Sequence, residues 1–283
     1  MESAYKETMF ILKKYNISAN KSLGQNFLID DNVIQNIVES ANITKEDLVI
    51  EIGPGLGTLT ARLLEKAKKV IAIELDNRMI KILNDRFSLY EKFELINEDV
   101  LKVDLRTLIS KNKAEKIKVV ANLPYYITTP IIMKLLEDKL EIESITVMVQ
   151  KEVAKRLIAK PGDKLSGAIT YSVNYYCEPE EVIIVPNLSF IPEPEVESEV
   201  IKLNLREKPP VEVENEELFF KLIKASFMQR RKTLINGITN SGLMGKEECK
   251  ELLRKVGLDE KVRGENLNMQ DFANLANEIK IKY

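Results

Sequence analysis

Residues 50–56 read I-E-I-G-P-G-L, and this stretch decides the fold class. The apolar run Val49–Ile52 predicts a buried strand, and the glycines after it predict a tight turn into a helix that begins near Thr58. Glycine is expected here because a Cβ atom would block a ligand that lies close to the backbone of the turn. The stretch therefore predicts a nucleotide-binding turn at the carboxyl end of a strand.

The next apolar run, Val70–Ile73, ends in Glu74, about twenty residues after the glycines. A nucleotide-binding sheet places at this position a carboxylate that accepts hydrogen bonds from both ribose hydroxyls. A site for a dinucleotide favours the spacing G-x-G-x-x-G, which binds a pyrophosphate. Here Gly53, Gly55 and Gly57 give G-x-G-x-G, so the third glycine comes one residue too early for that motif. A ligand with a ribose and no phosphates fits better, and S-adenosylmethionine (SAM) is such a ligand.

Short apolar runs alternate with amphipathic segments over the first 150 residues, which predicts an α/β fold with a parallel sheet covered on both faces. We expect strands at 48–52, 69–74, 93–96, 117–122 and 143–149, with helices at 58–67, 77–87 and 128–138. The other expected elements are helices at 5–15 and 165–176, a helix capped by Asp30 or Asp31, a polar loop at 20–28, and late strands at 181–185 and 199–203.

The two prolines of Arg206–Pro210 make this segment the best candidate for a linker. Only helical patterns follow it, at 216–228, 231–238, 246–256 and 269–279. We therefore predict a main domain at 1–205 and a small all-helical domain at 206–283.

Composition excludes several classes of protein. With 283 residues, 45% of them hydrophobic, the chain can bury a large core, and no apolar run reaches transmembrane length. The N-terminus has no signal-peptide pattern, so we expect a cytoplasmic protein without a membrane partner. Cys177 and Cys249 are too few for a metal cluster, and we expect no metal. The absence of histidine excludes Ser-His-Asp and Cys-His catalysis.

The net charge of −2 is unevenly distributed. Residues 178–217 hold roughly twelve acids against three bases, whereas residues 218–263 hold roughly eleven bases against five acids. A basic lobe of this kind can bind phosphate locally, although ordinary solvated helix faces would give the same pattern.

Asp99 follows the strand predicted at 93–96, at the same sheet edge as Gly53 and Glu74. A carboxylate at this edge can accept a hydrogen bond from the exocyclic amine of the cofactor's adenine. The alternative is that Asp99 caps the segment that follows it.

Asn122-Leu123-Pro124-Tyr125 ends the fourth predicted strand. The exocyclic amine of adenine is a poor nucleophile because its lone pair is delocalised into the ring. The side-chain oxygen of Asn122 and the carbonyl of Leu123 can accept its two N–H groups and favour a tetrahedral nitrogen. Tyr125 offers a ring on which a flipped base can stack. No strong base is needed, since the proton is lost readily once the nitrogen is cationic. A generic Asn-Pro turn is the alternative.

Several motifs in this order resemble the ribosomal small-subunit RNA adenine N6,N6-dimethyltransferase family (the KsgA group). They are K-S-L-G-Q-N-F-L (21–28), E-I-G-P-G-L-G (51–57), E-L-D (74–76), N-E-D (97–99), N-L-P-Y-Y-I-T-T-P (122–130), V-P-N-L-S-F-I-P-E-P-E-V-E-S (185–198) and F-M-Q-R-R-K-T-L (227–234). The resemblance implies a Rossmann-like class I SAM-dependent methyltransferase sheet followed by a small helical domain. It also implies dimethylation of two adjacent adenosines near the 3′ end of small-subunit rRNA, in a pre-ribosomal particle, by a monomeric enzyme.

The resemblance also assigns residues to roles. The cofactor positions it implies are Asn26, Leu28, Gly53, Glu74, Asp99 and Asn122. The target-base positions it implies are Asn122, Leu123 and Tyr125, with Phe190 as a second aromatic wall. The chain departs from the family pattern at Glu195, where the family has lysine, with Glu197 and Glu199 after it.

The sequence leaves three further alternatives open. Arg230, Arg231 and Lys232 are expected at the surface, where they can bind rRNA phosphates or clamp the two domains together. A large-subunit adenine methyltransferase of the macrolide-resistance type is an alternative function, but such enzymes read N-I-P-Y at the turn where this chain has Leu123. A non-catalytic ribosome-assembly factor that retains a SAM pocket is another.

Overall fold

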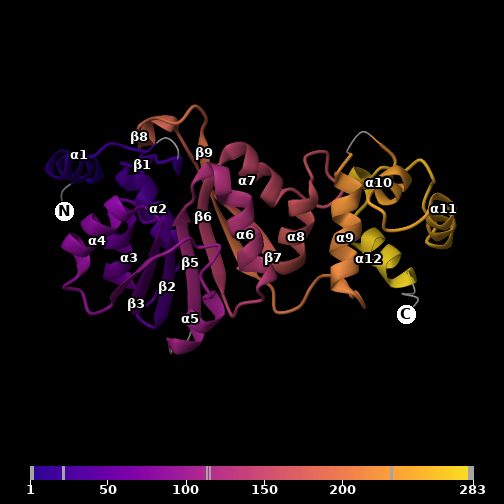
Figure 1. The fold of residues 1–283 in the computed structure, drawn as a ribbon, viewed down its shortest axis with the longest axis horizontal. Coiled ribbons are helices and arrows are strands. Elements are labelled where there is room, and N and C mark those ends of the chain that lie inside the picture. The colour runs from indigo at the N-terminus through magenta and orange to yellow at the C-terminus, as the bar shows by residue number, and fades with distance from the viewer. Residues whose placement is uncertain (1–2, 21–22, 113, 115, 230–231, 280–283) are drawn as a thin grey trace. The chain divides into compact units, whose positions relative to one another are not determined.

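The computed structural model describes residues 3–20, 23–112, 114, 116–229 and 232–279. Its main feature is a seven-stranded sheet with the strand order β4-β3-β2-β5-β6-β9-β7 (Figure 1). The strands are β2 (Asp47–Ile52), β3 (Lys69–Glu74), β4 (Phe93–Asn97), β5 (Lys116–Asn122), β6 (Ser144–Gln150), β7 (Cys177–Val185) and β9 (Ser198–Leu205).

The strand order reverses at β2, which pairs in parallel with β3 on one side and with β5 on the other. The β3–β4 and β5–β6 pairs are also parallel, whereas β9 runs antiparallel to β6. In open α/β sheets the carboxyl ends of the strands beside such a reversal form a crevice that binds ligands. The topology therefore places a binding site where β2, β3 and β5 end.

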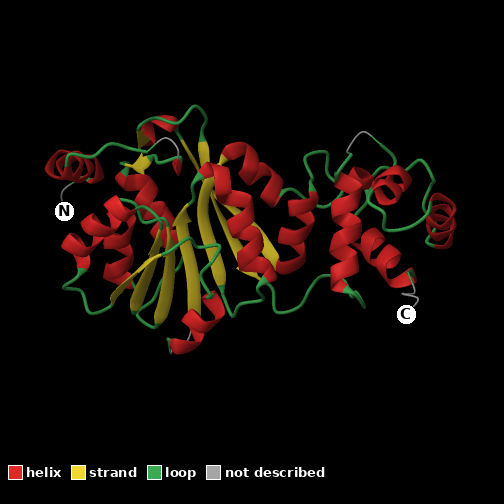
Figure 2. Ribbon diagram, in the orientation of Figure 1, coloured by secondary structure: helices red, strands yellow, loops and turns green. Residues whose placement is uncertain are grey.

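Helices connect the parallel strands, as Figure 2 shows. Those before and between them are α1 (Ala4–Tyr15), α2 (Asp31–Ser40), α3 (Thr58–Lys66), α4 (Asn77–Phe87), α5 (Leu105–Lys111), α6 (Thr128–Glu137) and α7 (Lys151–Ile158). Parallel crossovers are right-handed, so α3 and α4, which lead toward β4, lie on the opposite face from α6, which leads toward β6. This agrees with the predicted α/β fold, and α5 and α7 were not predicted.

The loop predicted at 20–28 contains a short strand, β1 (Phe27–Leu28), which pairs antiparallel with β8 (Phe190–Ile191). Phe27 and Leu28 are both buried. They belong to the same core cluster as the apolar side of α2 and the apolar residues of α3 and α4. The loop was predicted as polar, but its last two residues are part of the hydrophobic core.

The chain divides into two compact units, residues 1–154 with 179–205, and residues 155–178 with 206–283. The second unit contains α8 (Ala168–Tyr176), α9 (Glu216–Phe227), α10 (Leu234–Asn240), α11 (Lys246–Lys255) and α12 (Met269–Glu278). The predicted boundary at 205 therefore leaves out 155–178. The reason is that Tyr171 and Tyr175 of α8 are buried in one aromatic cluster with Phe219 and Phe272.

The helix predicted from Arg231 begins later, at Leu234. Thr233 adopts an extended backbone, and its hydroxyl accepts a hydrogen bond from the N–H of Asn236, so it caps the helix. Within the described ranges, no helix combines the length and apolar character that crossing a membrane requires.

Candidate active site

One cleft lies at the carboxyl ends of β2, β3 and β5, where the reversal of strand order predicts it. It is lined by Leu23–Leu28, Glu51, Gly53–Leu56, Thr58, Leu59, Glu74, Leu75 and Asn122–Tyr126. Seven predicted site residues are among them, namely Asn26, Leu28, Gly53, Glu74, Asn122, Leu123 and Tyr125. Residues separated by almost a hundred positions in the chain therefore meet in one place.

The glycine turn (Gly53–Gly57) requires glycine for two different reasons. Gly53 adopts φ +68°, in the left-handed region, and the nearest atom to a Cβ built there is 3.9 Å away. Its backbone conformation, and not crowding, therefore favours glycine. At Gly57 a Cβ would come within 2.5 Å of the Phe87 ring of α4. Close approach to a ligand was the expected reason for the glycines, but at Gly57 helix packing adds to a positive φ of +81°.

Glu74 is held in place by backbone N–H groups. Its Oε2 accepts from the N–H of Gly55 at 3.1 Å, and its Oε1 accepts from the N–H of Asp76 at 2.8 Å. Burial raises the pKa of Glu74, and these hydrogen bonds oppose the rise. The carboxylate thus has a fixed orientation at the end of β3, which suits an acceptor for ribose hydroxyls.

Glu51 is a cleft residue that we did not predict. It is 1% exposed, and burial raises its pKa to about 8. Its Oε2 is buried and has no hydrogen-bond partner among the described residues. A cationic amino group, such as that of the methionine moiety of SAM, would supply the missing partner. The only signal in the sequence was a carboxylate inside an otherwise apolar strand just before the glycine turn.

Leu75 was also missed. It is 48% exposed although it is apolar, and it lines the cleft directly after Glu74. An apolar side chain at this point offers a surface for the flat face of a base. The sequence does not single out Leu75, because one leucine after a strand is not a distinctive pattern.

Asn122 lies at the end of β5, and the next three residues complete the N-L-P-Y turn (Asn122–Tyr125). The side-chain Nδ2 of Asn122 donates to the carbonyl of Asn26 at 3.3 Å. This bond directs the amide so that its oxygen remains available to accept a hydrogen bond. The N–H of Leu123 donates to the carbonyl of Met148 on β6 at 3.1 Å, which anchors the turn to the sheet.

Tyr125 is fixed by a partner from the late segment of the chain. Its hydroxyl shares a hydrogen bond of 2.6 Å with Oγ of Ser198, which is fully buried at the start of β9. Burial raises the pKa of Tyr125, so the phenol is neutral at physiological pH. The ring of Tyr125 lines the cleft in a fixed position, as stacking on a base requires.

Two predicted site residues do not line the cleft. Asp99 is half-buried, and its Oδ1 accepts from the N–H of Leu101 at 3.0 Å, which is the capping arrangement considered as its alternative. Phe190 is 1% exposed in the hydrophobic core and stands opposite Leu28 in the β1–β8 pair. The expectation that Phe190 forms an aromatic wall of the cleft does not match this buried position.

The acidic residues at which the chain departs from the family pattern have different environments. Glu195 is exposed, and Glu197 forms an ion pair of 2.7 Å with Lys151, at the start of α7. Glu199 is 4% exposed within β9. Arg230 and Arg231 lie outside the described residues, whereas Lys232 is exposed and its N–H donates to the carbonyl of Gln229.

Comparison with known families identifies the chain. Residues 16–280 match the family model of the ribosomal RNA adenine dimethylases. The chain belongs to the ribosomal RNA adenine dimethylase family. The dimethylase family is one of SAM-dependent methyltransferases, so the predicted family and the predicted kind of enzyme are confirmed.

Two relatives of this chain are described as ribosomal RNA small subunit methyltransferase A. The protein of Clostridioides difficile is 49% identical and spans 99% of this chain and 97% of its own length. The protein of Bacillus pumilus is 51% identical, over 96% of this chain and 95% of its own.

Two solved structures resemble this chain closely enough to compare its fold. A dimethyladenosine transferase from Plasmodium falciparum has a TM-score of 0.72 and 30% identity, with 88% of this chain and 95% of that chain covered. The 23S rRNA methyltransferase ErmE has a TM-score of 0.66 and 26% identity, with 88% and 98% covered. These likenesses confirm the predicted Rossmann-like class I methyltransferase fold.

Proposed function

We propose that this protein uses SAM to dimethylate N6 of two adjacent adenosines near the 3′ end of small-subunit (16S) rRNA. One observation carries the proposal, namely that a single cleft contains the fixed carboxylate of Glu74 and the oriented amide of Asn122. The first group suits a ribose, and the second suits an exocyclic amine. Identity of about half with relatives described as small-subunit methyltransferases supports the choice of rRNA.

The cofactor would be held by the β2–β3 side of the cleft. Glu74 would accept from the ribose hydroxyls, and Glu51 would pair with the amino group of the methionine moiety. Leu75 would pack against the adenine of the cofactor. Asp99 would accept a hydrogen bond from the exocyclic amine of that adenine once the capping turn at Asp99 opens toward the cleft. Gly53, Asn26 and Leu28 would complete the site. When bound, SAM supplies an electrophilic methyl group on a positively charged sulfur.

The target adenine would be held by the N-L-P-Y turn. The side-chain oxygen of Asn122 and the carbonyl of Leu123 would accept the two N–H groups of the amine and localise its lone pair on nitrogen. Tyr125 would support the flipped base by stacking. The cationic nitrogen formed by transfer is strongly acidic, so its proton passes to solvent without a histidine. Repeating the step gives the dimethylated product.

The rRNA partner would be recognised as part of a pre-ribosomal particle, by a monomeric enzyme in the cytoplasm. Phe190 would serve as a second aromatic wall only after a rearrangement that exposes it. The helical domain, predicted at 206–283, would face the RNA, and Arg230, Arg231 and Lys232 are its proposed phosphate contacts.

Incubation with radiolabelled SAM and under-methylated small subunits, followed by mapping of the modified nucleotides, tests this function. Label on two adjacent adenosines near the 3′ end of 16S rRNA is the expected result. Free large subunits serve as the control, because label on their rRNA would favour the alternative of a large-subunit adenine methyltransferase, and ErmE is described as a 23S rRNA methyltransferase. Binding to the small subunit without any transfer would favour a non-catalytic assembly factor.

Replacing Arg230, Arg231 and Lys232 with glutamine tests the proposed RNA contacts. The salt dependence of RNA binding should become shallower by up to about three phosphate contacts. The melting temperature and the affinity for SAM should stay close to those of the wild type. An early melting transition together with an unaltered salt slope would instead favour a clamp between the domains.

A further inference from the structure

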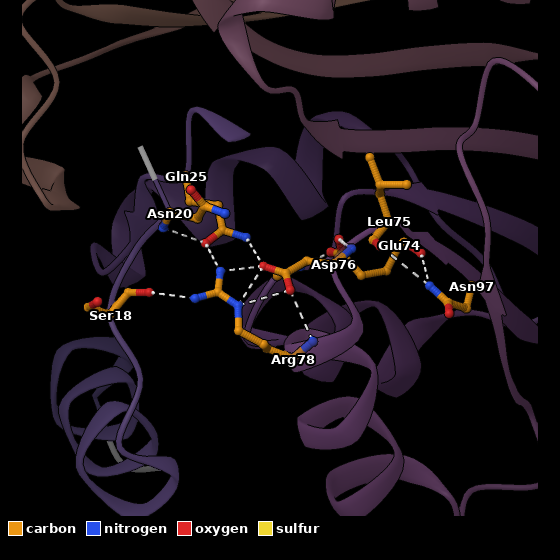
Figure 3. Close-up of polar contacts among 9 residues, drawn as sticks. Ser18, Asn20, Gln25, Glu74, Leu75, Asp76, Arg78 and Asn97 are labelled. Carbon is orange, nitrogen blue, oxygen red and sulfur yellow. Dashed lines mark hydrogen bonds and ion pairs between the residues drawn. The ribbon is translucent and has the colours of Figure 1, made fainter. Parts of the chain in front are cut away.

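The loop formed by Leu23–Leu28 contacts both halves of the cleft. On the cofactor side, Gln25 Nε2 donates to Oδ2 of Asp76 at 2.8 Å (Figure 3). On the other side, the carbonyl of Asn26 accepts from the side chain of Asn122. Adjacent residues of one loop are therefore bonded to Asp76, in the turn after β3, and to Asn122, the last residue of β5.

Gln25 is the centre of the contacts on the cofactor side. Its Oε1 accepts from the N–H of Asn20 at 2.8 Å and from Arg78 at 3.4 Å, while its Nε2 donates to Asp76. Arg78 also donates to the carbonyl of Ser18 at 3.4 Å. Both polar atoms of the Gln25 side chain thus bond to partners, and these bonds tie the loop and the chain that precedes it to the start of α4.

Asp76 gives this attachment a rigid base. Its carboxylate is 7% exposed and forms an ion pair with Arg78 at 2.5 Å. Burial opposes its ionisation, but the bonds from Arg78 and Gln25 outweigh burial and hold the pKa of Asp76 below its usual value. The N–H of Asp76 donates to Glu74, the proposed ribose acceptor. Gln25 is therefore connected to the carboxylate of Glu74 through two hydrogen bonds, by way of Asp76.

Packing keeps the loop against the other turns. The ring of Phe27 lies beneath Gly55, since a Cβ built on Gly55 would be 3.7 Å from it. The ring of Tyr126 lies against Gly24, where a built Cβ would be 3.4 Å from it. The loop thus contacts the glycine turn and the residue that follows the N-L-P-Y turn. A displacement of Gln25 would therefore also displace the residues of the loop that contact these two turns.

We propose that Gln25, with Arg78, is a positioning residue that holds the carbonyl of Asn26 where it orients the amide of Asn122. The inference rests on the proposed function, in which the oxygen of that amide accepts the adenine amine. Without the bond to Asn26, the Asn122 amide can rotate and present its NH₂ group, which repels another donor. Gln25 touches neither the base nor the methyl group, so it acts through the loop.

The test compares Gln25→Ala with Gln35→Ala. Gln35 is the matched control because its Nε2 also donates to a carboxylate, that of Glu39, at 2.7 Å, but on the exposed surface of α2. Calorimetry without RNA measures the affinity for SAM, and turnover at saturating SAM and RNA measures kcat. Gln25→Ala should weaken SAM binding and lower kcat, each on the order of tenfold. The KM for RNA should not change, and Gln35→Ala should match the wild type.

Arg78→Gln is a second variant, which keeps a polar side chain but removes the charge that holds Asp76. It should change the SAM affinity and kcat in the same directions as Gln25→Ala, by smaller factors. If Gln25→Ala has wild-type kcat and affinity, the proposal is wrong. It is equally wrong if only the melting temperature falls, because that is what a purely structural residue would give.

These results can be separated from a failure of the proposed function. The affinity for SAM is measured without RNA, and it tests the cofactor half of the positioning role by itself. If the wild type binds SAM but does not methylate small-subunit rRNA, the proposed function fails. A wild type that methylates, with a Gln25→Ala variant of equal kcat, overturns the positioning role alone.

Discussion

The glycine turn and the N-L-P-Y turn lie at the same edge of the sheet, yet different bonds hold their functional groups. Glu74, beside the glycine turn, accepts from two backbone N–H groups that are close to it in the fold of β2 and β3. Asn122 and Tyr125 depend on partners from opposite ends of the methyltransferase unit, Asn26 and Ser198. The cofactor side is therefore built from local motif geometry, whereas the base side requires the whole unit to be folded.

The two sides also differ in charge. Burial raises the pKa values of Glu51 and Glu74, and a ligand that carries a positive charge would favour the ionised form of both carboxyl groups. The N-L-P-Y turn presents a neutral amide, a carbonyl and a neutral phenol, which suit an uncharged base. Substitutions on the first side should consequently change binding, and substitutions on the second should change the rate of transfer.

The largest effect is expected for Asn122→Ala. Removing the oxygen that localises the lone pair of the amine should lower the rate of transfer by about 10²- to 10³-fold. Single-turnover measurements at saturating SAM on under-methylated small subunits provide the rate. Binding to those subunits should be retained, and full activity would remove Asn122 from the mechanism.

Glu74→Ala should weaken SAM binding by about 1.5–3 kcal/mol, because it deletes a charged acceptor for the ribose hydroxyls. Calorimetry measures the loss directly. The rate at saturating SAM should fall far less than it does in Asn122→Ala. An unchanged affinity would contradict the role assigned to Glu74.

Ser198→Ala should have a smaller effect, on the base side alone. Loss of the hydrogen bond to the Tyr125 hydroxyl removes about 1 kcal/mol of the free energy that fixes the ring, so the ring can tilt. We expect a several-fold rise in the KM for RNA with little change in SAM affinity, and partial recovery in Ser198→Thr, which restores the hydroxyl. A lower affinity of Ser198→Ala for SAM, with an unchanged KM for RNA, would contradict the assignment of Ser198 to the base side of the cleft.

The last prediction concerns stability and its dependence on pH, and not activity. The pKa of Glu51 is raised from 4.5 to about 8 in the folded protein, so folding favours its protonated form. Its contribution to stability is complete below pH 4.5 and is lost as the pH rises toward 8. Glu51→Gln, which mimics the neutral acid, should thus melt at the same temperature as the wild type near pH 4.5 and at a higher temperature at pH 8. Thermal unfolding measured without SAM from pH 4.5 to pH 8 gives the sign of the difference in melting temperature between Glu51→Gln and the wild type. A difference that stays constant over this range would show that the pKa of Glu51 is not raised by folding.

Most of the sheet could be predicted from the sequence, because each apolar strand and its following turn form a local pattern. The strands that end in Glu74 and Asn122 were predicted nearly to the residue. The helix α5 was missed, since its seven residues are too few for a clear helical period. The domain boundary was incomplete because α8 shares its aromatic core with helices more than forty residues away in the chain.

The sequence by itself determined the class of fold, the family and the residues at the strand ends, since those depend on short motifs and their order. Tertiary structure alone decided which side chains face the cleft. It buried Phe190 opposite Leu28 and gave Asp99 a capping role. It also left an oxygen of Glu51 without a partner in the cleft and bonded Gln25 to Asp76. The physical reason is that burial and hydrogen-bond partners depend on segments far apart in the chain, which a linear pattern does not record.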